Sequence, residues 1–454
     1  MSIKKSIYEE LVLESNDGKR TIDIATGVIS LDYYEDIFSP TITTRVKIVN
    51  TGNSITSENG TDRQSIYNGL PLRGGERVRL KVAGNSITNP GLDFTKKSSD
   101  YLYVSSITDV ISETNQESFT LHLVSREAIT NETVRVGRKY PTTLKISDSV
   151  ENILKDYLKT SKIGKIDKTS NKYGFIGNMR KPFTVLVWLA AKSVPESSGD
   201  GTAGFLFYQT QDGFQFRSID NLIKQSPRKD VNGKPVVYTY SQTNLSYDEE
   251  NNQVNNDFKI LNYFTEKNEN LIEKLKLGAF ASHRMFFNTL DFSFSKPEEG
   301  LFKLEDYSGK AKNLGRQITL PPLSEGSDKT LGDVPTRIIT AVYDVGTMEK
   351  DVSKSKEINS DQSKYQSQSL MRYNILFTQT LNVMVSSNTN LRAGDIIECQ
   401  FPRITQSKSK EYDREISGLY MIKELCHHFD SSNSYTSLKL VRDTFGTNVE
   451  EKES

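Results

Sequence analysis

The first 125 residues carry the hydrophobic pattern of β-strands. Polar and apolar side chains alternate through Arg45-Val46-Lys47-Ile48, which is typical of a strand with one buried face. Apolar positions recur across residues 21–50, and strand-like runs return at 77–82, 101–110 and 118–124. The polar stretch 51–68 is expected to be a loop. The pattern therefore predicts a β-rich N-terminal module.

The period of the pattern changes between residues 126 and 235. After Ser147, apolar side chains occur at the i, i+3, i+4, i+7 and i+8 positions of one helix face: Val150, Ile153, Leu154, Tyr157 and Leu158. Asp148 and Glu151 resemble a capping box at the start of this helix. A second helix is expected to begin near Pro182. The alternating runs on either side of Asp212-Gly213 predict a β-hairpin. The segment is thus predicted to be an α+β insert.

Strand patterns resume at residue 236. A short helix is predicted over 268–277, ending at Gly278, and the polar stretch 349–370 is expected to be a solvated helix. Residues 295–335 have the composition of a long loop. The predicted organisation is a first barrel module over 1–125, completed by about 236–262; the insert, 126–235; the first part of a second module with long loops, 263–370; its return strands, 371–446; and a flexible tail, 447–454.

The two ends of the chain contain related stretches in one order. The sequence LRGGE at 72–76 resembles LRAGD at 391–395, and each opens a strand. Two further blocks match: Leu102-Tyr103-Val104 with Leu419-Tyr420-Met421, and 119–126 with 435–442. The offsets between the matched blocks are 319, 317 and 316 residues. A glycine in each turn would supply the conformational freedom that a tight entry into a strand needs.

This repeat predicts a mainly β (α+β) chain with two related antiparallel modules, each a small β-barrel or an open sheet. Three copies would present six similar modules in a ring, which would let a threefold object dock onto a sixfold one. The alternative is a strand–turn–strand arrangement that recurs without common ancestry. The main residues of the repeat are expected to determine the fold rather than to form a site: Leu72, Gly75, Tyr103, Leu391, Gly394 and Tyr420.

The C-terminal stretches NTNLRAGDIIECQFP (388–402) and GLYMIKELCHHFDSSNSYTSLKLVRD (418–443) resemble the end of baseplate hub proteins of contractile-tailed, T-even-like bacteriophages. They are also similar to hub regions of type VI secretion spikes. LKLGAFASHRMFFNTLDFSF (275–294) looks hub-like as well, and the resemblance covers most of residues 20–445. Loops 51–68 and 295–365 depart from the family pattern.

The resemblance implies a structural protein of the virion, assembled in the host cytoplasm and placed in the tail baseplate. The family's hub is a homotrimer with two tube-like barrels per subunit. It joins the sixfold tail tube to the threefold central spike, and DNA passes through its channel at ejection without sequence-specific binding. The implied partners are the central spike protein, tail tube or tube-initiator proteins, and baseplate wedge proteins.

Composition excludes several other classes of protein. Lys plus Arg and Asp plus Glu each number 58, and this zero formal charge argues against a dedicated nucleic-acid or polybasic membrane binder. No apolar run approaches the ~20 residues of a membrane span, so no membrane insertion is expected. The N-terminus lacks the apolar core of a secretory signal. Cys399 and Cys426 cannot form a disulfide framework and are expected to stay reduced.

The remaining residues include few candidates for a catalytic or metal site. His427 and His428 adjoin Cys426, but neighbours on a strand point to opposite faces. Cys399 could approach Cys426, although the spacing is not that of a zinc site. The sole tryptophan, Trp188, is expected in the core of the insert. The candidate acid pairs lie in polar, loop-like sequence: Glu249-Glu250, Glu298-Glu299, and Asp413 with Glu415. No GxxxxGKS or GxSxG motif occurs.

These observations assign no catalytic, cofactor-binding or metal-ligating residue and no cofactor. Basic side chains alternate along one strand and are expected to face solvent or a subunit contact: Arg73, Arg77, Arg79 and Lys81. The leading hypothesis is a non-enzymatic hub subunit. Two alternatives stay open, a receptor-binding adhesin of the tail and a tail-associated cell-wall hydrolase. The internal repeat favours the hub, and the periodic repeats of a fibre are absent.

Overall fold

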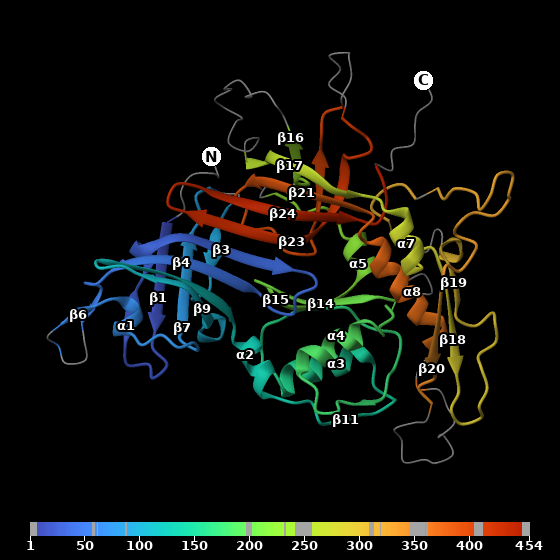
Figure 1. Ribbon diagram of the computed structural model, residues 1–454, viewed down its shortest axis with the longest axis horizontal. Coiled ribbons are helices and arrows are strands. Elements are labelled where there is room, and N and C mark those ends of the chain that lie inside the picture. The colour runs from blue at the N-terminus through green and yellow to red at the C-terminus, as the bar shows by residue number, and fades with distance from the viewer. Residues whose placement is uncertain are drawn as a thin grey trace.

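The alternating N-terminal runs form one antiparallel sheet in the computed structural model (Figure 1). Its strand order is β2-β1-β7-β9-β10-β4-β3, with β8 beside β7. In β4, Val46 and Ile48 are buried and Arg45 and Lys47 are exposed, as the alternation predicts. The strands are β1 (Ile7–Glu14), β2 (Thr21–Asp23), β3 (Val28–Asp36), β4 (Thr43–Thr51), β7 (Arg77–Ala83), β8 (Gly91–Asp93), β9 (Leu102–Ser112) and β10 (Gln116–Ser125).

The structure describes most of the chain. The residues described are 7–56, 60, 62–86, 89–196, 202–230, 233–240, 257–307, 313–317, 319–345, 359, 362–403 and 412–446. The acidic pair Glu249-Glu250 and the tail at 447–454 therefore lie outside the described residues.

Six strands of the C-terminal part close into a barrel. Its order is β23-β22-β16-β17-β21-β24, and a ladder between β24 and β23 completes the circle. The barrel is mixed, because β16 runs parallel to both of its neighbours, β17 and β22. The strands are β16 (Val237–Tyr240), β17 (Lys259–Asn268), β21 (Gln379–Ser386), β22 (Ile396–Gln400), β23 (Gly418–Asp430) and β24 (Ser434–Arg442).

Two expectations about the modules were wrong. β16 and β17, expected to complete the first module, pair instead with β22 and β21 of the barrel. The barrel is not purely antiparallel, because β16 is reached through a long connection from the insert and no hairpin sets its direction. The first module is an open sheet, because among the described residues no ladder joins β1 to β3. One backbone hydrogen bond, from Ile24 N to Leu11 O at 2.9 Å, links β1 to the turn that leads into β3.

The predicted repeat is present as structure, but its second and third sequence blocks were matched one residue out of register: Val104 corresponds to Ile422 and not to Met421, and Leu123 corresponds to Leu440 and not to Lys439. Strands β7, β9, β10 and β4 correspond in pairing to β22, β23, β24 and β21. In both modules the turn glycine is in a left-handed conformation, with φ of +95° at Gly75 and +90° at Gly394. Gly75 N donates to Val104 O at 2.7 Å, and Gly394 N donates to Ile422 O at 2.8 Å. The other repeat residues are buried beside these turns: Leu72, Tyr103, Leu391 and Tyr420. The repeat residues thus act in the fold, as expected.

One irregularity in each of two ladders has a counterpart in the other module, whereas the shifts at Ser118–Thr120 of β10 and at Thr265–Lys267 of β17 have none. The ladder between β9 and β10 skips Ser105, directly after Val104, and that between β23 and β24 skips Lys423, directly after Ile422. The ladder between β3 and β4 skips Ile29, and that between β17 and β21 skips Leu261. Since bulges are specific features of a strand rather than defects, their coincidence extends the repeat to β3 and β17. This coincidence favours common ancestry of the two modules over a strand–turn–strand arrangement that recurs without common ancestry.

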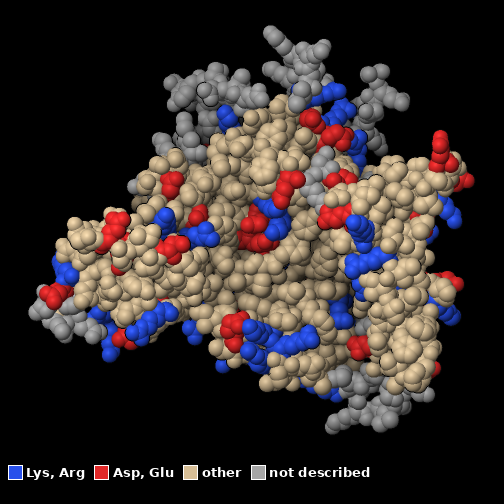
Figure 2. Space-filling model, in the orientation of Figure 1, with Lys and Arg blue, Asp and Glu red and all other residues tan. Residues whose placement is uncertain are grey.

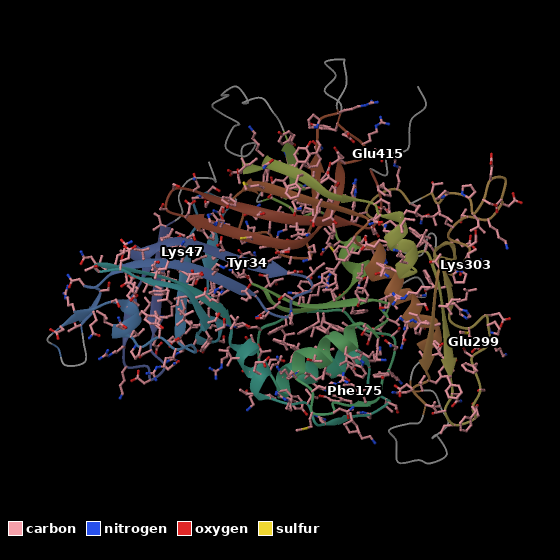
Figure 3. All side chains as sticks on the ribbon, viewed as in Figure 1. Tyr34, Lys47, Phe175, Glu299, Lys303 and Glu415 are labelled. Atoms are coloured by element: carbon pink, nitrogen blue, oxygen red, sulfur yellow. The ribbon has the colours of Figure 1, made fainter. Side chains whose placement is uncertain are left out.

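The insert packs beneath the sheets around its own aromatic core (Figure 1). The predicted hairpin forms from β14 (Phe205–Thr210) and β15 (Gly213–Ser218), and Thr210 pairs with Gly213. Phe175 (Figure 3) meets the ring of Trp188 edge-on, with centroids 5.5 Å apart, so the tryptophan packs at the core as expected. The other elements are α2 (Arg126–Thr133), β11 (Lys139–Tyr140), α3 (Ile146–Asp156), β12 (Ile163–Ile166), β13 (Phe175–Ile176), α4 (Pro182–Ala190) and α5 (Ile219–Lys224).

The capping box predicted for α3 is wrong. The helix begins at Ile146, its N-cap is Lys145, and no side chain caps it. Asp148 instead lies in the first turn, where its charge is favourable to the helix dipole. It lies 3.6 Å from the ammonium of Lys168. The second helix begins at Pro182 as predicted.

A peripheral unit lies beyond α8 (Gln362–Ile375), at the right of Figure 1. The polar stretch 349–370 was expected to be a solvated helix, but where it forms part of α8 it packs inward, with Ser367, Gln368 and Ser369 buried. Gly278 caps α7 (Leu271–Leu277) with φ of +68°, as predicted. The two long loops are partly structured. The first contains β5 (Ile55–Thr56), β6 (Arg63–Gln64) and α1 (Ile66–Gly69). The second contains β19 (Leu301–Lys303) and β20 (Arg337–Val342), which pair with β18 (Ala281–Phe287) in the peripheral unit.

Candidate assembly surfaces

The two modules are joined by a ladder of hydrogen bonds. β3 of the first module pairs antiparallel with β23 of the barrel over Ser30–Asp36 and Glu424–Asp430. This ladder makes both modules parts of one 14-stranded sheet. Tyr33 stacks on His427 at this joint, with ring centroids 6.0 Å apart. The chain therefore contains one complete example of how two such modules meet.

Glu35 ties three parts of the molecule together at the joint. Its Oε1 accepts hydrogen bonds from the Tyr33 hydroxyl at 2.8 Å and from Gln211 N at 2.7 Å. Its Oε2 accepts from Ala393 N at 2.9 Å. The residue is 1% exposed, and this burial raises the pKa of its carboxyl. β3, the hairpin of the insert and the turn of the barrel repeat thus share one buried carboxyl group.

His428 forms an electrostatic contact across the same joint. Its Nδ1 lies 2.5 Å from Asp32 Oδ1, and its Nε2 lies 3.5 Å from Asp430 Oδ2. The hydrogen bond to Asp32 raises the pKa of His428, and it outweighs the opposing effect of partial burial. When it is protonated, the imidazole of His428 therefore bridges the first module and the barrel.

The joint is expected to weaken as this imidazole loses its proton. Because the pKa of His428 is higher in the folded chain, its contribution is complete below the unfolded value of about 6.5. It is lost as the pH rises through the folded pKa. Urea unfolding of the full chain at several pH values should show the free energy of unfolding falling above pH ~6.5. His428→Gln should flatten this decline, and Asp32→Asn should do the same. A slope that His428→Gln leaves unchanged would assign the effect to other groups.

The adjacent histidine and the cysteines do not form a metal site. His427 is fully buried and bonds the Thr436 hydroxyl through Nδ1 at 3.0 Å, on the face opposite His428. Burial lowers the pKa of His427 to about 3. Cys399 pairs with Gly418, eight positions along β23 from Cys426, which separates the thiols by roughly 26 Å. The expected approach of the two cysteines is therefore wrong. Among the described residues no cluster of three potential metal ligands occurs.

The alternating basic strand β7 is neutralised by its neighbour β1. Arg77 pairs with Glu14, Arg79 Nε lies 3.1 Å from Glu10, and Lys81 Nζ lies 2.6 Å from Glu9. On the face drawn in Figure 2, basic and acidic side chains occur together over much of the described surface, and one group of basic side chains gathers over the insert at the lower centre. A strand of this kind stabilises its own sheet and does not provide the uncompensated charge that binding to DNA phosphates requires.

A polar cleft of about 350 Å³ opens where the first module, the insert and Arg392 meet. Its carboxylates include Asp212, 3.2 Å from Arg392, and Asp93. Partial burial acts to raise the pKa of Asp93, but hydrogen bonds from Thr95 hold it below its usual value. A general acid needs the opposite shift. Raised carboxyl pKa values occur instead at Glu35 and Asp395, where burial is the main cause and both carboxylates accept hydrogen bonds from backbone amides.

The other acid pairs are placed on the surface or in turns. Glu298 and Glu299 (Figure 3) are exposed on the peripheral unit. Asp413 caps a turn by accepting from Glu415 N at 2.8 Å and Ile416 N at 3.1 Å. Glu415 forms an ion pair with Arg316. Each of these groups has a local structural partner or faces solvent.

A buried ion cluster fastens the insert to α8 and to the end of β24. Arg372 is fully buried and donates to Asp220 Oδ1 through Nε at 3.0 Å and through one Nη at 2.8 Å. Its other Nη donates to Asp443 Oδ2 at 2.9 Å. Asp220 Oδ2 also accepts from the backbone and the hydroxyl of Thr202. Sequence analysis missed this cluster and Glu35, because isolated charged residues carry no local signal of their partners.

Two strand edges carry exposed apolar side chains. On the outer edge of β9, Val110 and Ile111 are 41% and 59% exposed. On β17, Leu261 and Phe264 are 39% and 60% exposed. Proteins ordinarily protect such edges with charge, proline or a covering segment, so exposed apolar edges mark candidate contact surfaces.

No described helix is long and apolar enough to cross a membrane.

No family model matches the chain, and no curated protein matches it in sequence. Solved structures do match. The 43 kDa tail protein of prophage MuSo2 from Shewanella oneidensis aligns with a TM-score of 0.51 and 9% identity, over 96% of this chain and 98% of that one. A tail protein from Neisseria meningitidis MC58 aligns with a TM-score of 0.51 and 11% identity, over 96% of both chains. An E. coli component of the type VI secretion system, the c3393 protein, aligns at a TM-score of 0.39 and 9% identity, over 94% of this chain and 74% of that one. Over nearly its whole length, the chain has the fold of phage tail proteins.

Proposed function

We propose that the chain is a structural subunit of a phage tail baseplate hub. Three copies form a ring that joins the sixfold tail tube to the threefold central spike and surrounds the DNA channel. The observation that carries this proposal is the internal repeat: one chain contains two corresponding modules, joined by a strand ladder into one sheet. Three such chains offer six corresponding surfaces at one end and three whole subunits at the other.

The shared fold with two tail proteins supports a place in a tail. The central spike, the tube or tube-initiator proteins and the wedge proteins are proposed as neighbours, and the passing DNA is not bound by sequence. The described acid groups with raised pKa values are engaged in the fold, which favours a structural role over hydrolysis. We assign the chain to the virion after assembly in the host cytoplasm.

The native mass of the purified chain tests this function. Size exclusion with light scattering should give a trimer of three times 51.3 kDa, about 154 kDa. Particles of threefold symmetry in negative-stain images would support the ring. A chain that stays near 51.3 kDa at every concentration, alone and with its spike partner, contradicts it. A peptidoglycan zymogram provides the second arm, because lysis abolished by mutating one carboxylate would replace the structural role with an enzymatic one.

A further inference from the structure

The repeat implies a second joint of the kind seen within the chain. The internal joint pairs β3 with the outer edge of β23. The strand that corresponds to β23 is β9, whose pairing with β7 involves only Leu102 and Tyr103. Among the described residues no strand pairs with the outer edge of β9 from Ser105 to Ser112. The first module therefore has an open edge where the barrel has β3.

The strand that corresponds to β3 is β17, and its outer edge is also open. β16 pairs with β17 only at Lys259 and Ile260, which leaves the edge from Leu261 onward without a described partner strand. One chain therefore carries one half of the joint on the first module and the other half on the barrel. The halves belong to different modules of the same chain, so they can be joined only by meeting in neighbouring copies.

The register of the second joint follows from the bulges. Asp32 lies three residues after the bulge at Ile29, and Phe264 lies three residues after the corresponding bulge at Leu261. His428 pairs with Tyr435 of β24, five residues before Leu440. Ile111 pairs with Ser118 of β10, five residues before Leu123, the counterpart of Leu440. Since Asp32 faces His428 in the internal joint, Phe264 should face Ile111 in the external one.

The chemistry of the two positions agrees with this register. The side chains of Asp32 and His428 are 17% and 18% exposed, because each covers the other. Phe264 and Ile111 are 60% and 59% exposed, and both are large and apolar. An aromatic side chain opposite a β-branched one is a favourable cross-strand pair in a sheet. The internal joint thus has a charged contact where the external joint would have an apolar one.

We propose that the ring closes by strand addition between copies: the outer edge of β17 in one subunit pairs antiparallel with the outer edge of β9 in the next, and Phe264 packs against Ile111. This inference rests on the trimeric ring proposed above and specifies its contact. Internal and external joints then alternate around the ring, and one continuous sheet passes through three copies. Because the contact is head-to-tail, it closes when the rotation per subunit reaches 120° and otherwise extends as a filament.

Disulfide trapping in the full-length chain tests the register. In the Ile111→Cys, Phe264→Cys double variant the two thiols should come within bonding distance, because directly opposed residues of antiparallel strands have Cβ atoms about 4.5–5.5 Å apart. Oxidation should give a covalent trimer on a non-reducing gel. Either single variant controls for coupling through Cys426. The Ile111→Cys, Thr265→Cys pair is the matched control, because residue 265 faces the other side of the strand.

Charge substitution provides a second measurement that needs no oxidation. Ile111→Lys or Phe264→Glu alone should raise the dissociation constant of the trimer about 10- to 100-fold, because each places a charge against an apolar side chain. The double variant should recover most of the affinity, since lysine and glutamate would then face each other.

The outcomes separate this contact from the proposed function. A native trimer with no cross-link from 111 to 264, and with a mass insensitive to both charges, overturns the strand joint and leaves the hub standing. A chain that is monomeric throughout overturns both. Cross-linking into open ladders instead of a trimer supports the edge contact and contradicts closure of the ring.

Discussion

Replacing Asp220 by alanine is expected to lower the free energy of unfolding by about 3–5 kcal/mol. The change leaves Arg372 buried with Asp443 as its remaining carboxylate partner, and it also removes the acceptor of two hydrogen bonds from Thr202. Asp443 still balances the charge of Arg372, so the cost arises because buried donors of Arg372 and Thr202 lose the acceptor they had, in a site without access to water. Urea unfolding of the full chain, followed by circular dichroism, measures the loss.

Two variants show whether charge or size is responsible. Asp220→Asn keeps the shape but removes the charge, so a loss close to that of alanine would identify the ion pair as the main contribution. Glu151→Ala is the matched surface control. Glu151 pairs with Lys155 and Lys168 on the exposed side of α3, and its loss should cost less than about 1 kcal/mol. Equal effects at positions 220 and 151 would contradict the importance of the buried cluster.

The second large effect is expected at the turn of the barrel repeat. Gly394→Ala places a Cβ 2.4 Å from the hydroxyl oxygen of Tyr208 in a residue whose φ is +90°. Tyr208 is 2% exposed, so its ring could move away only within the packed interior. Backbone strain of about 1–2 kcal/mol and overpacking of about 1–3 kcal/mol should together destabilise the chain by about 2–5 kcal/mol.

The first module provides the control for this substitution. Gly75 has almost the same conformation, with φ of +95°, but its added Cβ would meet only the amide group of Asn16, an exposed side chain, at 3.0 Å. Gly75→Ala should therefore show the strain alone, about 1–2 kcal/mol. Thermal unfolding of the two variants compares them directly. If Gly75→Ala destabilised the chain as much as Gly394→Ala, the contact with Tyr208 would add nothing to the backbone strain at residue 394.

The sequence predicted those parts of the fold whose signals are local. The turns at Gly75 and Gly394 were recognised because a turn glycine, a preceding leucine and a following strand recur together. The hairpin at Thr210–Gly213 was recognised from Asp212-Gly213 between alternating runs, and the second helix was recognised from a proline suited to the first helical turn. These elements depend on backbone conformations that few residue types adopt, so the residue type is informative.

The parts that were missed depend on partners far away in the chain. β16 has few residues and runs parallel to its neighbours, and no turn signals to which sheet it belongs. The role of Glu35 is set by Gln211 and Ala393, which lie 176 and 358 residues further along the chain. The exposed edge at Phe264 could be recognised only after the bulges had fixed the correspondence between the modules.

The ladder between β3 and β23 also constrains how the chain is made. β3 is complete at residue 36, whereas β23 begins at residue 418. At 5–20 residues per second, a ribosome needs about 20–80 s to add the residues between them. Throughout that time the nascent N-terminal module presents an unpaired strand edge, which is a template for wrong pairing. Synthesis that stops before residue 418 would leave that edge permanently open, so prematurely terminated chains should be prone to aggregate, whereas full-length chains cover it.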